Sequence, residues 1–161
     1  MIVFICSVLL LQAQVDTITP PYKRFPTVPP LQLLLGDSTT KFTKDNIPRK
    51  KPVLIMLFSP DCNHCQRTAE ELWQHQKEMK DIVIVMSTLH SISQMNAFVR
   101  EYRLDEIKNI VTGKDVHYIL PSFYGIKNLP YLAMYDRKGK LIMGFEGSMP
   151  VIKILQTFKE K

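Results

Sequence analysis

The chain has 161 residues, a formal net charge of +6 at pH 7, 45% hydrophobic and 22% charged side chains. This balance predicts one packed globular domain and excludes a chain that is disordered throughout. The one dense basic run, Arg49-Lys50-Lys51, is short and precedes an apolar stretch, which is typical of a solvated loop, so we predict no nucleic-acid partner.

The chain starts with MIVFICSVLLL, which carries no charged side chain and is nearly all apolar. A helix that spans a bilayer needs about 20 residues, so this segment is too short to span and fits the apolar part of a secretory signal. We predict a signal peptide over residues 1–14, cleaved near Ala13, which removes Cys6 and leaves no stable membrane span. The protein is then expected to be exported and periplasmic, with association to the outer side of a membrane as the alternative. The alternative is that this segment forms a first strand of the fold.

Residues 15–30 contain five prolines, which predicts an extended, Pro-rich lead-in rather than a helix. The folded domain is expected over residues 31–161. Its first strand is predicted at 31–35 (LQLLL), and the polar residues 37–52 that follow include two prolines that break regular structure. The uninterrupted apolar run at 53–58 (VLIMLF) predicts a strand that is covered on both faces, as in a parallel sheet.

The hydrophobic period then changes to steps of three and four, which predicts one helix of roughly 17 residues. The positions that share its face are Cys65, Ala69, Leu72, Gln76 and Met79.

A second buried strand is predicted at 82–86 (IVIVM), followed by an amphipathic helix through 92–102. The segments 131–135 and 140–145 flank the turn sequence DRKG and predict a hairpin. A last helix is expected at 151–158. The order of elements is therefore β, then β-α-β-α, then β-β-α, which indicates an α/β fold with a central mixed sheet flanked by helices.

Cys62 and Cys65 form a C-x-x-C motif where the buried strand ends and the first long helix begins. A helix N-terminus offers free N–H groups and the positive end of the helix dipole, and both favour a thiolate over a thiol. Cys62 is therefore the expected nucleophile. Two intervening residues bring Cys65 within bonding distance, so Cys65 is expected to resolve a mixed disulfide held on Cys62.

Two neighbours are expected to tune this pair. His64, when protonated, adds positive charge near the Cys62 sulfur and stabilises the reduced form. Asp61 acts in the opposite direction, because a carboxylate beside Cys62 disfavours its thiolate. If the Asp61 side chain caps the helix, the backbone N–H groups absorb part of its charge.

Two other interpretations of the motif remain open. The first is a copper or metal chaperone of the same fold that binds its ion through Cys62, Cys65 and His64. The second is an inert, structural cysteine pair. A structural zinc site needs four ligands, and the remaining histidines do not complete a zinc motif. They are expected at the surface or in the core: His75, His90 and His117.

The segment KPVLIMLFSPDCNHC, residues 51–65, resembles the thioredoxin-like pattern of buried strand, short loop, C-x-x-C and helix. Downstream, FYGIKNLPYLAMYDRKGKLIMGFEG, residues 123–147, resembles the TlpA/ResA branch of exported thioredoxin-like proteins. That branch has Y-G-V-x-x-x-P followed by a strand, Asp-x-x-Gly and another strand. The resemblance covers residues 31–161 and implies a thioredoxin-like fold, with a cis Pro130 packed against the active-site cysteines and with the backbone around Leu129 pairing with an extended substrate.

The chain departs from the family at the positions of its usual acids. Thioredoxins carry a buried Asp where this chain has Met56, and the ResA-type branch carries a Glu where it has Thr68. Glu70 and Glu71 lie nearby in sequence, but helical spacing turns both away from the face through Cys65. The resemblance therefore implies a thiol–disulfide oxidoreductase, acting on protein thiols and disulfides with a redox partner protein and no cofactor, whose direction of reaction remains open.

Overall fold

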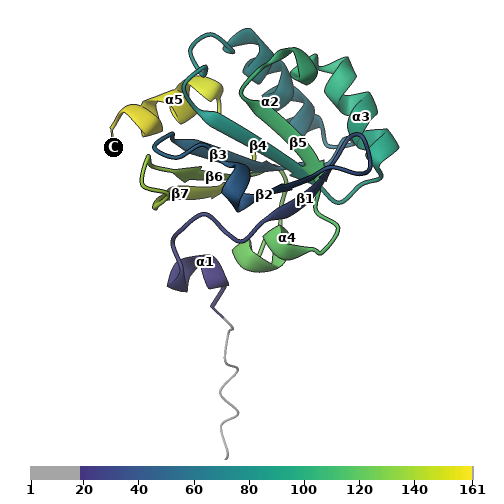
Figure 1. Cartoon of the computed structure of the whole chain (residues 1–161). Coiled ribbons are helices and arrows are strands. Elements are labelled where there is room, and N and C mark those ends of the chain that lie inside the picture. The colour runs from purple at the N-terminus through teal and green to yellow at the C-terminus, as the bar shows by residue number, and fades with distance from the viewer. Residues whose placement is uncertain (1–18, 161) are drawn as a thin grey trace, which may run out of the picture.

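The computed structural model describes residues 19–160, and the predicted signal peptide, with Cys6, lies outside them. Within this range, seven strands form one sheet in the order β2-β1-β5-β4-β3-β6-β7, and helices cover both of its faces (Figure 1). Across residues 19–160, none of the helices has the length and apolar character that crossing a membrane requires.

The strands are β1 Gln32–Leu35, β2 Lys41–Thr43, β3 Val53–Leu57, β4 Val83–Thr88, β5 Ile110–Lys114, β6 Tyr131–Tyr135 and β7 Leu141–Glu146. The helices are α1 Pro21–Arg24, α2 Asn63–Gln74, α3 Ile92–Glu101, α4 Ile119–Tyr124 and α5 Val151–Lys159, with the short 3-10 turns η1 Lys44–Asn46 and η2 Leu104–Glu106.

Strand β3 lies near the middle of the sheet and fixes the position of the cysteine motif. It runs parallel to β4 and antiparallel to β6, so that Leu57 pairs with Ser87 on one side and with Tyr131 on the other. Every residue of β3 is buried, because the sheet is covered on both faces. The predicted fold class, a mixed sheet flanked by helices with the C-x-x-C motif at the start of the first long helix, is confirmed.

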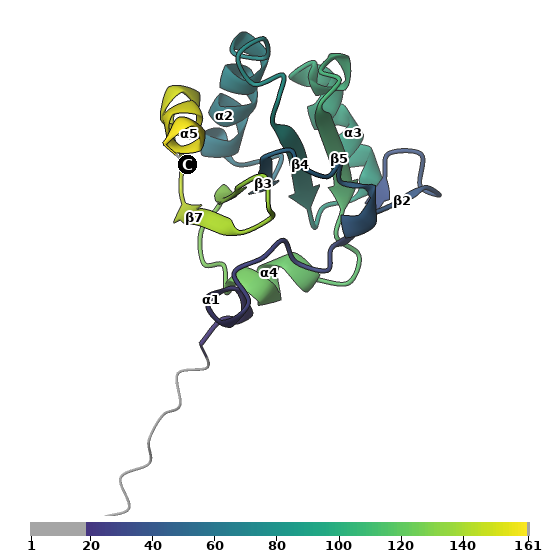
Figure 2. The ribbon, with the colours of Figure 1, turned by 60° about the vertical axis from the view of Figure 1, so that its left-hand side comes forward.

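Two hydrophobic clusters hold the layers together, one on each face of the sheet. On one face, α2, α3 and α5 pack over alternate residues of the central strands, including Leu54, Met56 and Met86. On the other face, α4 and the N-terminal segment around Val28 cover Ile55 and the residues next to it. Figure 2 shows this separation, with α2, α3 and α5 on one side of the sheet and α1 and α4 on the other.

Three elements of the sheet region were not expected from the sequence: β2, β5 and α4. In β2 only Phe42 is buried, so the strand has no hydrophobic run to reveal it. Strand β5 includes Thr112 and Gly113 and is only partly buried along its length, so its hydrophobic pattern is also weak. Both strands form because they pair with β1, β5 also pairing with β4, and such pairing is a tertiary effect that local patterns do not report.

The first long helix is shorter than the hydrophobic period indicated. Helix α2 ends at Gln74, although Met79 is buried as predicted. The side-chain amide of Gln76 donates to the carbonyl oxygen of Trp73 at 2.9 Å, and the backbone N–H of Gln76 also points to that oxygen. Gln76 thereby satisfies a carbonyl at the C-terminal end of the helix, and the chain then reaches Met79 through turns.

The Pro-rich lead-in was predicted to be extended, but part of it is helical. Residues Pro21–Arg24 form one helical turn, α1, which packs against α4. A proline is tolerated in the first turn of a helix because its missing N–H has no partner there. Beyond this turn, Thr27 bridges to Lys140 and Val28 is buried, so the second half of the lead-in packs on the domain.

Candidate active site

Cys62 is itself the N-cap of α2. Its backbone is extended, with φ −93° and ψ 112°, and its sulfur accepts a hydrogen bond from the backbone N–H of Cys65 at 3.4 Å. The sulfur therefore takes the place that a Ser or Asp oxygen fills at other helix starts. The Cys62 sulfur thus lies at the positive end of the helix dipole and satisfies an N–H group that has no partner within the helix.

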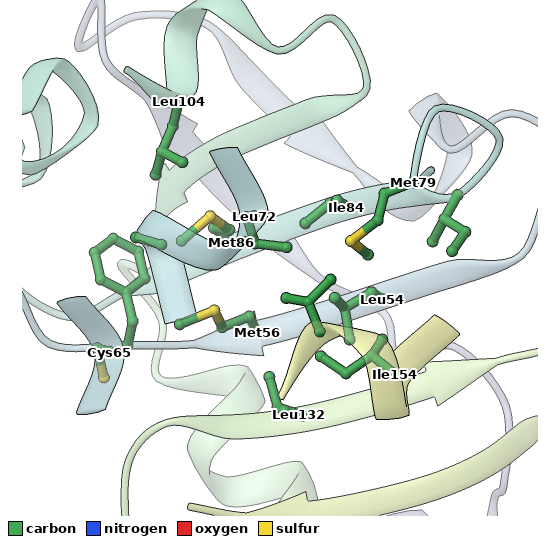
Figure 3. Close-up of a cluster of buried hydrophobic side chains, with 14 of the residues drawn as sticks. Leu54, Met56, Cys65, Leu72, Met79, Ile84, Met86, Leu104, Leu132 and Ile154 are labelled. Atoms are coloured by element: carbon green, nitrogen blue, oxygen red, sulfur yellow. The ribbon is translucent and has the colours of Figure 1, made fainter. Parts of the chain in front are cut away.

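Cys65 occupies a different environment three residues later. Its side chain is fully buried and lies at one end of the hydrophobic cluster that also contains Met56 and Leu72 (Figure 3). Burial, followed by the hydrogen bond with Cys62, raises the pKa of the Cys65 thiol to about 12. The two thiols therefore differ in the way that nucleophile and resolving thiol differ: Cys62 is partly exposed and Cys65 is hidden.

The loop before β6 closes the site from the other side. The Leu129–Pro130 peptide bond is cis, the isomer that the resemblance implied. The Cys62 thiol donates to the carbonyl oxygen of Leu129 at a distance of 3.7 Å. Pro130 is buried, whereas Leu129 is half-buried and packs against both hydrophobic clusters. The structure thus brings together the cysteines and the loop that the sequence had assigned to one site.

The two predicted tuning residues are placed differently. Asp61 is exposed and precedes the N-cap, so the helix is capped by Cys62 and not by this carboxylate. His64 is also exposed, in the first turn of α2, and its Nδ1 lies 2.8 Å from the guanidinium of Arg67. Because a guanidinium only donates, Nδ1 must accept that hydrogen bond through its lone pair. The positive charge beside this turn is then supplied by Arg67.

The absence of the usual family acids shapes the buried side of the site. Met56 is fully buried, and the Thr68 hydroxyl donates to the carbonyl oxygen of His64 at 3.0 Å. Glu71 is turned away from the cysteines, as predicted, and its Oε2 accepts from the backbone N–H of Val151 at 2.7 Å. Neither position of the family acids therefore offers a carboxylate to the Cys65 thiol.

His90 was expected at the surface or in the core, and the structure places it next to the loop that carries the cysteine motif. Its Nε2 lies 3.0 Å from the Ser59 hydroxyl, and this contact is partly buried. The backbone carbonyl oxygen of Ser59 also accepts a hydrogen bond from the backbone N–H of Cys62 at 3.1 Å. The available signal was positional: Ser59 and His90 each follow one of two adjacent parallel strands, whose carboxyl ends meet at the same edge of the sheet.

The geometry gives little support to a metal site. Among residues 19–160, no three or more His, Cys, Asp or Glu side chains gather closely enough to hold an ion. His64, the third ligand of the copper interpretation, directs Nδ1 to Arg67. The arrangement suits thiol–disulfide exchange between the two neighbouring cysteines and a sulfur of another molecule.

A family model described as a thioredoxin-like domain matches residues 41–161 of the chain. The family expected from the sequence is thereby confirmed. No curated protein matches the chain.

Solved structures share the fold. A secreted Mycobacterium tuberculosis disulfide oxidoreductase homologous to E. coli DsbE is 16% identical with a TM-score of 0.69, covering 82% of this chain and 96% of that one. The exposed lipoprotein thioredoxin Etrx1 of Streptococcus pneumoniae is 26% identical with a TM-score of 0.61, covering 81% and 98%. StoA of Bacillus subtilis is 15% identical with a TM-score of 0.59, covering 82% and 98%.

Proposed function

The chain belongs to the thioredoxin-like domain family, and on that premise we propose that it is a thiol–disulfide oxidoreductase that works through Cys62 and Cys65. The observation that carries the proposal is the contrast between the two sulfurs. Cys62 caps α2 and faces the Leu129 carbonyl, while Cys65 is buried three residues behind it. A merely structural pair would not need one partly exposed sulfur at a helix N-terminus.

In the reducing direction, the Cys62 thiolate attacks one sulfur of a substrate disulfide. A new Cys62–substrate disulfide forms, and the other substrate sulfur leaves as a thiolate, which takes up a proton. Cys65 then loses its proton and attacks the Cys62 sulfur, which forms the Cys62–Cys65 disulfide and expels the second substrate thiolate. Two electrons pass from the cysteine pair to the substrate. The same steps in reverse oxidise a substrate dithiol.

The substrate is proposed to be an extended protein segment that contains the exchanging cysteine. The Leu129 backbone lies next to Cys62 and precedes β6, so a segment that pairs with Leu129 as an added strand would present its sulfur to Cys62. Recognition through the backbone makes few demands on substrate sequence. A second protein thiol pair is needed to restore the starting redox state of Cys62 and Cys65.

We also infer that the protein acts outside the cytoplasm. The support is the apolar start of the chain, which fits a secretory signal. Two structural relatives point the same way, since one is described as secreted and another as an exposed lipoprotein. Fusion of the first residues of the chain to a reporter enzyme that is active only after export tests this inference, and a reporter that stays inactive contradicts it.

The test of the activity is turnover of a model disulfide. Reduced protein is mixed with insulin and dithiothreitol, and the precipitation of reduced insulin is followed by turbidity. We expect acceleration over dithiothreitol alone and its loss in Cys62→Ser. When reduced Cys65→Ser is freed of dithiothreitol and then mixed with insulin, we expect a trapped mixed disulfide. No acceleration by the folded wild-type protein, together with no mixed disulfide in Cys65→Ser, would overturn the proposal.

A further inference from the structure

Ser59 connects the two cysteines to a histidine that the proposed reaction does not use. Its carbonyl oxygen accepts the backbone N–H of Cys62 at 3.1 Å. Its own backbone amide lowers the pKa of the Cys65 thiol, in opposition to the larger effect of burial. Its hydroxyl lies 3.0 Å from Nε2 of His90. One residue therefore contacts Cys62, influences Cys65 and holds the His90 ring.

The buried Cys65 thiol has no carboxylate beside it at the family positions to assist its deprotonation. Cys65 must give up a proton before it can resolve a mixed disulfide, and its burial opposes this step. Carboxylates could assist from the positions of Met56 or Thr68, but this chain has none there. The hydrogen bonds of the loop between β3 and α2 lead instead to His90, whose side-chain type changes charge between pH 5 and 8.

We propose that His90 is a positioning residue for the resolving step, acting through Ser59, so that its protonation speeds the closure of the Cys62–Cys65 disulfide. This inference rests on the proposed oxidoreductase function. When neutral, the His90 ring can accept the Ser59 hydroxyl proton. When protonated, Nε2 must donate to Ser59, and a positive charge then stands beside the residue whose backbone amide lowers the pKa of Cys65.

The step balances without any further reactant. Cys65 loses its proton to solvent, its thiolate attacks the Cys62 sulfur, and the substrate thiolate leaves and is protonated. The imidazolium charge stabilises the transient Cys65 thiolate electrostatically. If the imidazolium makes the Cys65 thiol about tenfold more acidic, about tenfold more Cys65 is present as thiolate. A thiolate of lower pKa is a weaker nucleophile, by about threefold here, so the resolving step becomes about threefold faster.

Other charged groups near His90 belong to the surrounding elements. The loop before α2 carries Asp61, the end of β5 carries Lys114 and Asp115, and Lys127 lines a pocket together with the end of β4. The Asp115 carboxylate accepts the backbone N–H groups of His117 and Leu120, so it is already engaged within its own loop. In the described part of the chain, none of these groups is hydrogen-bonded to the His90 ring, which is bonded to Ser59.

The experiment follows the two thiol-exchange steps separately. Reduced full-length protein reacts with 5,5′-dithiobis(2-nitrobenzoate): attack by Cys62 releases one coloured thiolate and resolution by Cys65 releases a second. Rates of both phases are measured from pH 5.5 to about 8.5, across the range in which histidine titrates. Wild type is compared with His90→Gln, Ser59→Ala, the double variant, and a matched control, His75→Gln, at the far end of α2.

We expect His90→Gln to slow the second phase about threefold at pH 6 and not at pH 8.5, because only the protonated ring adds charge. Ser59→Ala should show the same loss, and the double variant no more than either single variant, since both act through one contact. His75→Gln should match wild type. The inference is overturned if the second phase of folded His90→Gln keeps the wild-type pH profile.

The outcomes separate this inference from the proposed function. If wild-type protein releases no second thiolate at any pH, the oxidoreductase function itself fails. If both phases are present in wild type and unchanged in His90→Gln and Ser59→Ala, the function stands and the role of His90 is refuted. A loss in His90→Gln that is equal at all pH values indicates a structural effect and also refutes it.

Discussion

The sulfur of Cys62 lies 3.7 Å from the carbonyl oxygen of Leu129, although 67 positions separate the two residues in the chain. This contact joins the start of α2 to the loop before β6. It places the partly exposed sulfur beside a backbone that can pair with an incoming strand. Cys65, by contrast, lies behind this contact and inside the core.

The two thiols should therefore differ sharply in reactivity. At pH 7, iodoacetamide is expected to modify reduced Cys65→Ser as fast as wild type, because Cys62 is the accessible thiol. Reduced Cys62→Ser should react at least about 100-fold more slowly, since Cys65 is buried and its pKa is raised. Mass spectrometry of timed samples measures both rates. Equal rates in the two single variants would contradict the assignment of roles.

The stability of the reduced protein should fall at alkaline pH. The pKa of the Cys65 thiol rises from 9.0 to about 12 on folding, so the folded state holds its proton where the unfolded state has lost it. The stabilisation is complete below pH 9 and is lost as the pH rises toward 12, by up to about 1.4 kcal/mol per pH unit. Burial also raises the pKa of Tyr124, which steepens the fall further.

Urea unfolding at pH 7, 9 and 10.5 measures this dependence. The variant Cys65→Ala keeps the tyrosines and loses the thiol, so the slope of its unfolding free energy above pH 9 should be shallower than that of reduced wild type. The oxidised protein, in which neither thiol titrates, should also show a shallower slope. Identical slopes in all three proteins would show that the Cys65 thiol does not contribute.

The charge of Asp61 should have a small and salt-sensitive effect on the reduction potential. Asp61 is exposed and does not cap α2, so water and salt screen its repulsion of a Cys62 thiolate. Removing the charge in Asp61→Asn should stabilise the thiolate and make the couple more oxidising by about 10 mV, which corresponds to about half a kcal/mol.

Equilibration with glutathione buffers at 0.05 and 1 M salt measures that potential. The shift should shrink at high salt, and Glu70→Gln, which removes an exposed carboxylate farther along α2, should leave the potential unchanged. A shift toward a more reducing potential, or one that persists at 1 M salt, would show that Asp61 interacts with Cys62 more directly than the structure indicates.

Glu71 should matter for stability and not for redox chemistry. Its carboxylate accepts the backbone N–H of Val151, the first residue of α5, at 2.7 Å, and so satisfies a donor that the helix cannot. Glu71→Ala is expected to lower the free energy of unfolding by about 1–2 kcal/mol. The neighbouring Glu70→Ala is the control, with a change within about 0.5 kcal/mol.

Urea denaturation and the insulin assay together check this prediction. Glu71→Ala should keep wild-type turnover at a temperature where it is fully folded, because Glu71 does not contact either cysteine. Equal destabilisation by Glu70→Ala and Glu71→Ala would mean that the hydrogen bond to Val151 contributes nothing specific.

Local patterns in the sequence predicted much of the fold. The apolar run at 53–58, the helical period after Cys62 and the hairpin around the DRKG turn all match structured elements. These elements bury faces that their own residues define, so their periodicity is visible in the sequence. The cysteine motif could be placed at the start of a helix for the same reason. Strands β2 and β5 had no such signal, because pairing with neighbouring strands defines them.

Only the tertiary structure shows which residues of the site contact one another when they are distant in the sequence. The sequence suggested Asp61 as a possible cap of α2, and only the path of the backbone decided that the Cys62 sulfur fills the N-cap. Ser59 and His90 are separated by 31 positions and show no common pattern. They meet because β3 and β4 are adjacent and parallel, so the residues that follow both strands emerge at one edge of the sheet. Residue types are written in the sequence, but which strands become neighbours is decided by the packing of the whole chain.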